Sequence, residues 1–304
     1  MAPNAQPQQE RLDPNGLLHL GVVYLVWSST YLAIRFAVRE GAGFPPFTLG
    51  LLRAVVAGAV LLVWARLSGR HLRLTRREVG LLAASGILLW VGGNGLVSLA
   101  ETRADSGLAA LMIAGVPIWG ALIEAIIDRR PPTLQLAAAL LIGFSGIAVL
   151  TLPQLLSGVR ADVIAVLALL GAGLFWAMGS VLQARKPTGL PSRVSAGYQM
   201  LFGALGFAVV VLLVGEPQPT PTTAAWLAWG YLVLFSSILA FTSYVTALRV
   251  LPTRIAMTYA YVNPVLAVLL GWIILNEHIT AWTLAGSALV LLGVGGVFRE
   301  RRGH

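Results

Sequence analysis

The sequence predicts an all-α polytopic membrane protein whose ten transmembrane helices form two inverted-topology five-helix repeats, with both termini in the cytoplasm. Three observations predict this class. Of the 304 residues, 57% are hydrophobic and only 11% are charged. Ten apolar runs are long enough to cross a bilayer. The segment 98–150 is repeated at 245–297, a constant offset of 147 residues.

The composition predicts that most of this chain lies in a lipid bilayer. A soluble domain carries charge on roughly a quarter of its residues, and this chain falls far short of that fraction. The chain contains no cysteine, which excludes disulfides, thiolate metal sites and cysteine nucleophiles. Its first fifteen residues are polar and rich in proline, so no removable signal peptide is expected.

The predicted spans follow from the length of the apolar runs, because about 20 helical residues cross some 30 Å of hydrocarbon. The ten spans are residues 16–38, 46–67, 78–100, 105–127, 134–152, 161–184, 193–214, 223–248, 252–275 and 279–298. The connections between them are short and contain proline, glycine or charged residues. They leave no room for a soluble domain.

The repeat divides the chain into two copies. The offset pairs Pro117 with Pro264 and Gly146 with Gly293. The predicted organisation is a polar cytoplasmic tail (1–15), a first five-helix repeat (16–152), a linker (153–160), a second five-helix repeat (161–298) and a basic cytoplasmic tail (299–304). An odd number of spans makes the copies enter the membrane from opposite sides, an architecture typical of alternating-access transporters.

The basic residues predict the orientation, since Lys and Arg gather on the cytoplasmic side of a membrane. With a cytoplasmic N-terminus, sixteen of the 21 Lys and Arg residues lie on the cytoplasmic side, three lie outside and two lie within spans. The net charge of +9 therefore reflects orientation. The basic loops have no interleaved aromatic residues, so we expect no nucleic-acid partner.

Aromatic residues near the bilayer centre indicate a binding cavity. An indole N–H needs an acceptor that lipid tails do not offer, so central tryptophans are expected to face protein or a cavity. Neighbours one helical turn away, and tyrosines at similar depth in the second half, extend the pattern. Helix packing is the alternative for each single ring. Taken together, the predicted substrate-binding residues are Trp27, Tyr31, Trp90, Asn94, Trp119, Trp176, Tyr244 and Tyr259, and they suit an amphipathic solute of amino-acid size.

The matched prolines predict two helix kinks. Pro117 and Pro264 each lie about 18 Å into a predicted span. Neither can donate to the carbonyl four residues earlier, at Ile113 or Ala260, so two acceptors are freed at membrane depth. Such discontinuities on matched helices commonly border a transport site. The alternative is that a neighbouring hydroxyl satisfies each kink and nothing binds there.

Ionisable residues within spans are few. Arg53 lies about 10 Å deep, where a structural ion pair or a bond to helix-end carbonyls is favoured over recognition of a substrate carboxylate. Arg35 and Glu101 fall near the outer interface, where they could pair. There is no run of buried carboxylates, so the sequence leaves proton coupling and facilitated diffusion both open.

The chain lacks the motifs of enzymes and of ATP-driven pumps. It contains no HExxH, GxSxG or Walker-type GxxxxGK sequence. We therefore expect no enzymatic activity, no catalytic residues, no metal site, no cofactor and no ATP-binding site in this chain.

Several short stretches resemble a known family. Residues 244–252, 259–264 and 275–280 with Gly293 resemble the second half of an EamA-type transporter of the drug/metabolite transporter superfamily, and residues 27–29, 52–53 and 100–117 resemble its first half. The resemblance implies ten helices, a central cavity and export of small metabolites across the bacterial inner membrane. Within this family, the chain is most similar to ten-helix amino-acid exporters. One departure is that Glu277 has Arg130 as its counterpart by offset.

The predicted function is therefore an alternating-access transporter that exports amino acids, aromatic ones among them, or similar small metabolites across the bacterial inner membrane. The alternatives are a passive channel for small polar solutes, or an exporter of drugs or other metabolites. Polarity is concentrated centrally and interrupted by bulky aromatics, which favours a transporter over a channel. The lipid bilayer and the small-molecule substrate are the expected partners. The substrate, the direction and the oligomeric state stay open, with a monomer as the working expectation.

Overall fold

The computed structural model describes residues 12–104, 106–156, 162–266 and 280–299, and all regular elements in these residues are helical. The first half contains α1 (Pro14–Trp27), α2 (Thr30–Val38), α3 (Pro46–Leu67), α4 (Arg76–Gly86), the π-helix η1 (Ile87–Gly95), α5 (Leu96–Ala100), α6 (Ser106–Ile113), α7 (Val116–Asp128) and α8 (Leu134–Leu156). The second half contains α9 (Val163–Arg185), α10 (Ser192–Val214), α11 (Thr223–Tyr231), the π-helix η2 (Leu232–Phe241), α12 (Thr242–Val250), α13 (Thr253–Ala256), a helix over residues 259–266, and α15 (Ala281–Arg299).

Seven of these helices, counted through their internal breaks, are long and apolar enough to cross a membrane. They are Pro14–Val38, Pro46–Leu67, Arg76–Ala100, Leu108–Asp128, Val163–Arg185, Ser192–Val214 and Thr223–Val250. Each end agrees with a predicted span to within three residues. Two shorter apolar helices, Leu134–Val149 and Leu284–Arg299, correspond to the fifth and tenth predicted spans. The ninth predicted span, 252–275, continues past residue 266 into positions that lie outside the described residues.

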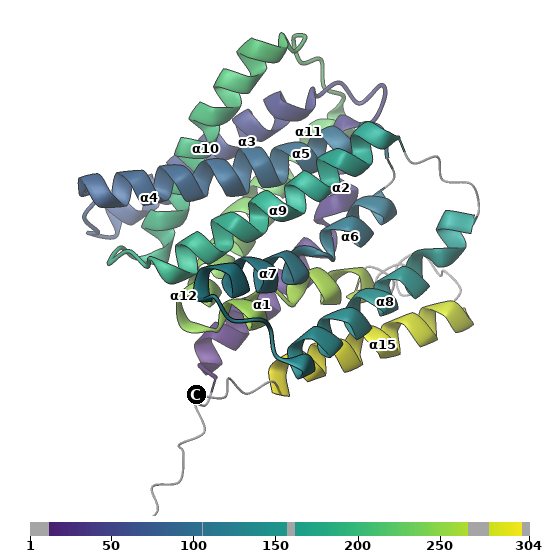
Figure 1. Cartoon of the computed structure of the whole chain (residues 1–304). Helices are drawn as coiled ribbons and strands as arrows, with labels where there is room; N and C mark the ends of the chain where they lie inside the picture. Colours follow the sequence, from purple (N-terminus) through teal and green to yellow (C-terminus); the bar gives the residue numbers. More distant parts are fainter. Residues whose placement is uncertain (1–11, 105, 157–161, 267–279, 300–304) are drawn as a thin grey trace, which may run out of the picture.

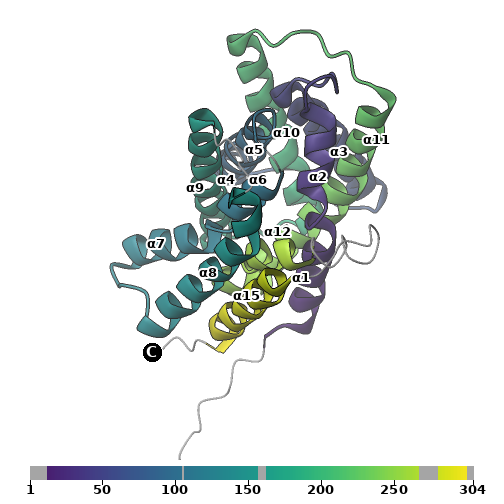
Figure 2. The same cartoon turned by 90° about the vertical axis from the view of Figure 1, so that its right-hand side faces the viewer.

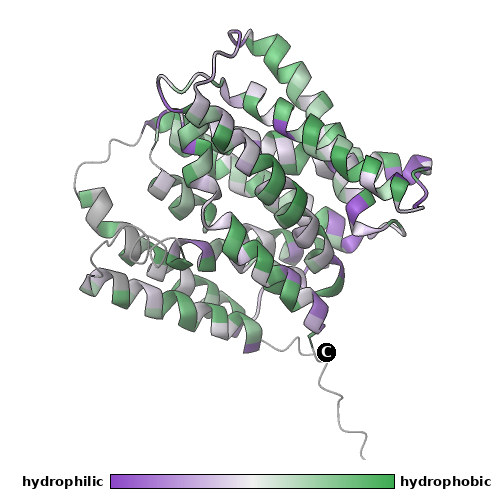
Figure 3. Cartoon of the chain, turned by 180° about the vertical axis from the view of Figure 1, so that it is seen from behind, coloured by the Kyte–Doolittle hydropathy of each residue, from purple (hydrophilic) through white to green (hydrophobic). Residues whose placement is uncertain are grey.

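The outer surface of the bundle is apolar. Large hydrophobic side chains point away from the protein along several helices; among them are Leu25, Leu141 and Leu212, at 67%, 62% and 81% exposure. Most of the helical ribbon is coloured as hydrophobic in Figure 3, and many of the hydrophilic residues lie in connecting loops and at helix ends. Since lipid tails solvate such side chains and water does not, this surface fits a bilayer.

Helices related by the 147-residue offset pack against each other in opposite directions. Helices α8 and α15 lie side by side at one edge of the molecule (Figures 1 and 2). Gly146 of α8 faces Gly286 and Val290 of α15, whereas Ala139 faces Gly296. The partner residue number thus rises as the α8 number falls, so the pair is antiparallel. Antiparallel packing of matched helices is what an inverted repeat requires.

The second matched pair, α3 and α10, follows the same rule. Gly50 of α3 lies against Phe207 of α10, and Gly58 lies against the carbonyl of Gly197. The first helix of each half packs on the other half. Helix α9 of the second half contacts η1 and α5 of the first, and α1 of the first half contacts η2 and α12 of the second. The core therefore lies between the two copies, where each half completes the packing of the other.

Several of the described spans are interrupted by a turn or a π-helix near their middle. The α1–α2 break lies at a serine pair, Ser28 and Ser29, whose hydroxyls donate to the carbonyls of Leu25 and Val26. Such hydroxyl-to-backbone bonds compete with the helical ladder and bend helices. The matched helix α9 is continuous over this depth. The third and eighth spans instead contain the π-helices η1 and η2 at nearly matching offsets.

The two proline helices depart from the predicted symmetric kinks. A turn at residues 114–115 separates α6 from α7, so Pro117 lies in the first turn of α7, where its missing N–H costs no intrahelical bond. In the other copy the turn lies at Met257 and Thr258, and Pro264 lies further along, inside the helix over 259–266. The Thr258 hydroxyl donates to the carbonyl of Ile255 at 2.6 Å. The breaks are therefore offset between the copies.

Candidate functional site

A cavity lies in the core between the two halves and occupies about 530 Å³. Its walls come from α1, α2, α3, η1, α5 and α6 of the first half and from α9, η2 and residue 259 of the second. The lining residues are Trp27, Thr30, Tyr31, Ile34, Arg53, Gly93, Asn94, Val97, Ile113, Ala172, Trp176, Ser236, Phe241 and Tyr259. Its mixture of aromatic walls and a few polar groups is typical of small-molecule sites.

A cluster of four aromatic rings closes one side of the cavity. The Trp27 ring lies 5.4 Å from the Trp176 ring and 4.8 Å from the Tyr259 ring, and both pairs are edge to face. Tyr244 lies behind them, 5.1 Å from Trp27 and 5.4 Å from Tyr259. Edge-to-face pairs at these distances are favourable beyond the area they bury. The rings therefore form a cohesive wall built from both halves.

Hydrogen bonds fix the orientation of these rings. The Trp27 indole donates to the backbone carbonyl of Ser236 at 3.2 Å, and the Trp176 indole donates to the Tyr244 hydroxyl at 3.3 Å. The Tyr244 hydroxyl is also bonded to the Ser180 hydroxyl at 2.7 Å. Both indole N–H groups thus find acceptors on other helices, as buried indoles require.

Arg53 is the charged group of the cavity wall, and it is only 4% exposed. Its Nε donates to the Ser237 hydroxyl at 2.6 Å, Nη2 to the Ser236 hydroxyl at 3.0 Å and Nη1 to the Asn94 side-chain oxygen at 3.3 Å. The guanidinium lies 5.0 Å from the Trp90 ring. Among the described residues no acidic side chain pairs with it. The expected ion pair or helix-end carbonyl is therefore replaced by three neutral side chains.

The two π-helices place the partners of Arg53. Asn94 lies on η1, and Ser236 and Ser237 lie on η2. The Asn94 side-chain amide donates to the carbonyl of Leu89 at 3.3 Å, and the Ser237 hydroxyl donates to that of Leu232 at 2.9 Å, each five residues back. Single-turn π segments within α-helices occur frequently at functional sites.

The eight predicted binding residues occupy three kinds of position. Trp27, Tyr31, Asn94, Trp176 and Tyr259 line the cavity. Trp90 and Tyr244 are fully buried behind this lining, where Trp90 packs 5.2 Å from Phe241. Trp119 is partly buried, lies beside Gly173 of α9 and is not among the lining residues. Of the prolines, Pro117 follows the break next to the lining residue Ile113, and neither Pro117 nor Pro264 lines the cavity.

Sequence reasoning missed several residues of the site. It gave Arg53 a structural role, and it did not select Thr30, Ser236 or Phe241. A detectable signal was present for Arg53, because an arginine about 10 Å inside a span is a functional candidate by default. Serines within a span give no such signal, because a serine hydroxyl can donate its hydrogen bond to a backbone carbonyl of its own helix.

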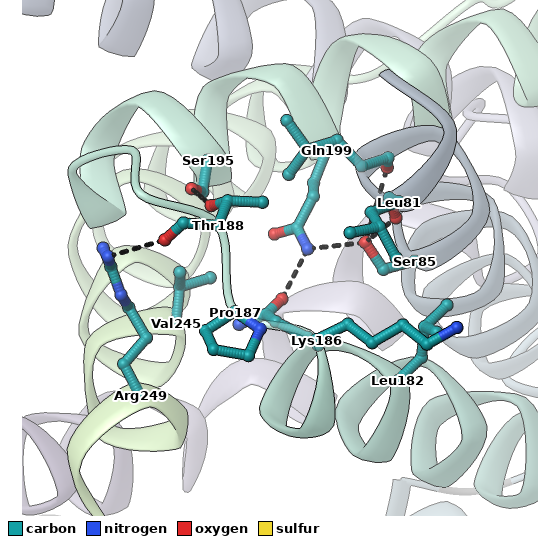
Figure 4. Close-up of a pocket in the computed structure, with 12 residues that line it drawn as sticks. Leu81, Ser85, Leu182, Lys186, Pro187, Thr188, Ser195, Gln199, Val245 and Arg249 are labelled. Carbon is teal, nitrogen blue, oxygen red and sulfur yellow. Dashed lines mark hydrogen bonds between the residues drawn. The ribbon is translucent and has the colours of Figure 1, made fainter. Parts of the chain in front are cut away.

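A second pocket of about 350 Å³ lies between the ends of α4, α9, α10 and α12, near the α9–α10 connection. Gln199 is fully buried there; its amide donates to the Ser85 hydroxyl at 2.8 Å and to the side-chain oxygen of Gln183 (Figure 4). Arg249 donates to the carbonyl of Thr188 at 3.1 Å. These bonds tie α10 to α4 and α9, and α12 to the α9–α10 connection.

The described residues contain no group of three or more His, Cys, Asp or Glu side chains arranged to hold a metal ion.

An apolar bundle of two antiparallel copies around a buried aromatic and polar cavity defines a membrane transporter. The chain belongs to the EamA-like transporter family, whose profile matches residues 15–152 and 163–299. It is a multi-pass inner-membrane protein that acts on a small-molecule substrate.

The relatives of the chain span most of its length. It is 35% identical over 255 residues to the uncharacterized inner membrane transporter YedA of Escherichia coli K12, covering 83% of this chain and 80% of that protein. It is 26% identical to protein PecM of Dickeya dadantii, covering 91% and 92%. One crystal structure superposes with a TM-score of 0.74 at 24% identity, covering 93% of this chain and 96% of that one. At this identity the superposition shows the fold.

Proposed function

We propose that this protein is an alternating-access transporter with ten membrane spans and cytoplasmic termini, which exports amino acids or similar small carboxylate metabolites across the inner membrane. The observation that carries the proposal is Arg53, a buried guanidinium on the wall of an aromatic cavity whose hydrogen-bond partners are all neutral.

The chemistry of Arg53 favours an anionic ligand. A guanidinium keeps its positive charge in proteins, and its planar fork matches a carboxylate with two parallel hydrogen bonds. Bonds to neutral hydroxyls and an amide orient the group but leave its charge uncompensated. A substrate carboxylate would supply the missing negative charge in a site of low dielectric, where the attraction is strong.

The remaining wall favours a substrate with an apolar or aromatic side chain. Trp27, Trp176, Tyr259 and Phe241 offer ring faces and edges within the same cavity. Most of the lining is apolar or aromatic with a few polar groups, which is the usual composition of a small-molecule site. The positive charge of Arg53 opposes cationic drugs, which argues against the alternative of a drug exporter.

Alternating access is supported by contacts between elements on both sides of the cavity. The Gln199 network and the aromatic wall lie on one side. At the opposite end, Arg35 donates to the backbone carbonyl of Glu101, and the Glu216 carboxylate accepts from the amides of Phe47 and Thr48 at 2.9 and 2.7 Å. The breaks in α1–α2 and α6–α7 provide joints about which the halves can move.

The test is a flux measurement with purified protein in liposomes. A panel of tritiated L-amino acids, one organic cation and one neutral polyol is offered to protein-containing vesicles. We expect saturable uptake of amino acids that is accelerated by the same amino acid on the opposite side. Flux that does not saturate would identify a passive channel, and uptake of the cation alone would identify a drug exporter.

A matched pair of variants assigns the flux to the cavity. Arg53→Gln removes the buried guanidinium of α3, while Arg66→Gln removes an exposed one at the end of the same helix. We expect amino-acid flux to fall at least tenfold in Arg53→Gln and to stay near the wild-type rate in Arg66→Gln. Equal flux in both variants would contradict the role given to Arg53.

A further inference from the structure

Glu101 is a buried carboxyl group that has no place in the substrate site described above. It directly follows α5 and is 0% exposed, and neither of its carboxyl oxygens has a hydrogen-bond partner. Its backbone amide donates to the carbonyl of Val97 at 2.9 Å. Because Val97 lines the central cavity, Glu101 lies one helical turn beyond the cavity wall.

The groups that face Glu101 come mainly from α2. Arg35 donates a hydrogen bond to the backbone carbonyl of Glu101 and none to its carboxyl oxygens. Tyr31, one turn earlier on α2, lines the cavity, as does Tyr259. The helix that meets Glu101 through Arg35 therefore also reaches the substrate cavity.

The other elements packed on α5 add no opposite charge. Helix α3 contributes Arg53, which is bonded to η1 and η2, and η1 has no ionisable side chain. Helix α9 has one ionisable residue, Arg185, at its far end. Arg103, two residues after Glu101, pairs with Asp162 at 2.9 Å. Of the residues that the structure describes, Arg35 is therefore the cation that faces the Glu101 side chain at this end.

A carboxylate in this position is unfavourable, whereas a carboxylic acid is tolerated. Ionisation would leave a charge without hydrogen bonds in a site closed to water, and buried groups avoid this by binding a proton. Ionisable residues at membrane depth commonly mark proton pathways for this reason. When the halves move and Glu101 meets water or the Arg35 guanidinium, the ionised form becomes favourable again.

We propose that Glu101 is a proton-binding site that couples the transport cycle to the proton gradient. The inference rests on the proposed function, because it adds a driving ion to the same cavity. The Glu101 carboxylate takes one proton from the outer solution when the outer side is open. The neutral acid is carried through the conformation seen here, in which the carboxyl group is fully buried, and it releases that proton to the cytoplasm when the inner side opens. One proton entering per cycle would drive substrate export by exchange.

The first test observes the proton directly. Infrared difference spectra of the purified wild-type protein are recorded across a pH titration, together with those of Glu101→Gln and Glu40→Gln. We expect a carboxylic-acid C=O band at neutral pH that is absent in Glu101→Gln. Glu40 is an exposed carboxyl beyond the end of α2, so Glu40→Gln should keep the band. A spectrum without this band in the wild type would overturn the proposal.

The second test uses transport of a tritiated L-amino-acid mixture into liposomes. A pH gradient should raise steady-state accumulation at least fivefold in the wild type and in Glu40→Gln. Glu101→Gln should lose this accumulation but keep exchange without a gradient, since glutamine mimics the neutral acid. Wild-type accumulation that ignores the gradient, or gradient-driven accumulation in Glu101→Gln, would overturn the coupling. A wild type without any flux would instead overturn the proposed function, and the infrared band then decides the proton site alone.

Discussion

At the scale of single residues, the guanidinium of Arg53 determines the chemistry of the cavity. Its three hydrogen bonds reach side chains of both halves, at Asn94, Ser236 and Ser237. The group is therefore a link between the copies as well as the proposed site for an anion. Any motion that separates η1 from η2 would change its environment, so the proposed binding of a carboxylate would be connected to movement of the halves through one side chain.

Replacing Arg53 by lysine should separate charge from shape. The ammonium group of the Arg53→Lys variant would keep the positive charge but lose the planar fork and the bonds to three partners. A charge-assisted hydrogen bond contributes about 1.5–3 kcal/mol, so KM for an amino acid should rise roughly tenfold or more, at about 1.4 kcal/mol per decade. Exchange kinetics in liposomes measure this. A KM in Arg53→Lys equal to that of the wild type would show that charge alone suffices.

The tryptophans should divide by their position relative to the cavity. Trp176 lines the cavity, so Trp176→Ala should change the order of preference among amino acids while leaving monodisperse protein. Trp90 is fully buried behind the lining, and Trp90→Ala should instead destabilise the fold by about 3–5 kcal/mol through the cavity left behind. Uptake profiles and thermal denaturation distinguish the two effects. The assignment fails if Trp176→Ala keeps the wild-type preference order.

The same division explains what the sequence could predict about the site. Depth along a helix can be counted from the sequence, and the residues chosen by depth include five that line the cavity. The direction in which a side chain points depends on how helices pack. Trp119 of α7 lies against Gly173 of α9 and is not part of the cavity lining. Arg53 was assigned a structural role because its neutral partners come from η2, 183 and 184 residues away in the chain.

At the scale of helices, glycine contacts hold the matched pair α8 and α15 together. A Cβ atom at Gly146 would lie 2.6 Å from the backbone nitrogen of Val290, whereas one at Gly295 would meet nothing within 4 Å. Small residues let membrane helices approach closely and pack by van der Waals contact. The close approach at Gly146 therefore depends on the absence of a side chain.

Alanine at these two glycines should have opposite effects. Gly146→Ala should lower the free energy of unfolding by about 1–3 kcal/mol, because the extra methyl group overpacks the α8–α15 contact. Gly295→Ala should be neutral or stabilising by up to about 1 kcal/mol, because alanine is the better helix former. Thermal unfolding in detergent compares them. Equal melting temperatures for the two variants would contradict the packing assigned to this pair.

The helix breaks show where sequence reasoning stops. Pro117 and Pro264 predicted discontinuities in matched helices, and each helix has a break, but only the first lies next to its proline. The second break lies at Met257 and Thr258. The Thr258 hydroxyl bonds the carbonyl of Ile255 there, and a threonine in a sequence does not indicate a helix break as a proline does. The π-helices η1 and η2 contain no proline at all. Their geometry follows from packing between the copies, which a single sequence does not display.

At the scale of the whole molecule, the orientation in the membrane can be tested without background labelling, because the chain has no cysteine. We expect a cysteine at Arg70, in the arginine-rich connection after α3, to react with an impermeant maleimide only from the cytoplasmic side. A cysteine at Arg103, beyond α5, should react only from the outside. Labelling of intact cells and of inverted vesicles compares the two. Reaction of both cysteines from one side would refute the proposed topology.

The architecture was the most predictable level. Apolar length alone located the seven spanning helices to within three residues at each end. The 147-residue offset matched α8 with α15, but their antiparallel contact, and that of α3 with α10, is seen only in the structure. The asymmetry of the copies was harder to predict, because α1 breaks at Ser28 and Ser29 while α9 stays continuous. Those differences arise where the cavity is built, so the shared fold does not make the halves equivalent.

The central claim is that Arg53 recognises a substrate carboxylate inside the cavity, and the most direct test compares L-phenylalanine with L-phenylalaninamide. The two compounds differ only at the group that Arg53 is proposed to bind. In wild-type liposomes we expect phenylalanine to be exchanged at least tenfold faster than the amide, and in Arg53→Gln we expect this preference to fall to less than twofold. A preference that survives unchanged in Arg53→Gln, or a wild type that exchanges both compounds equally, would contradict the account.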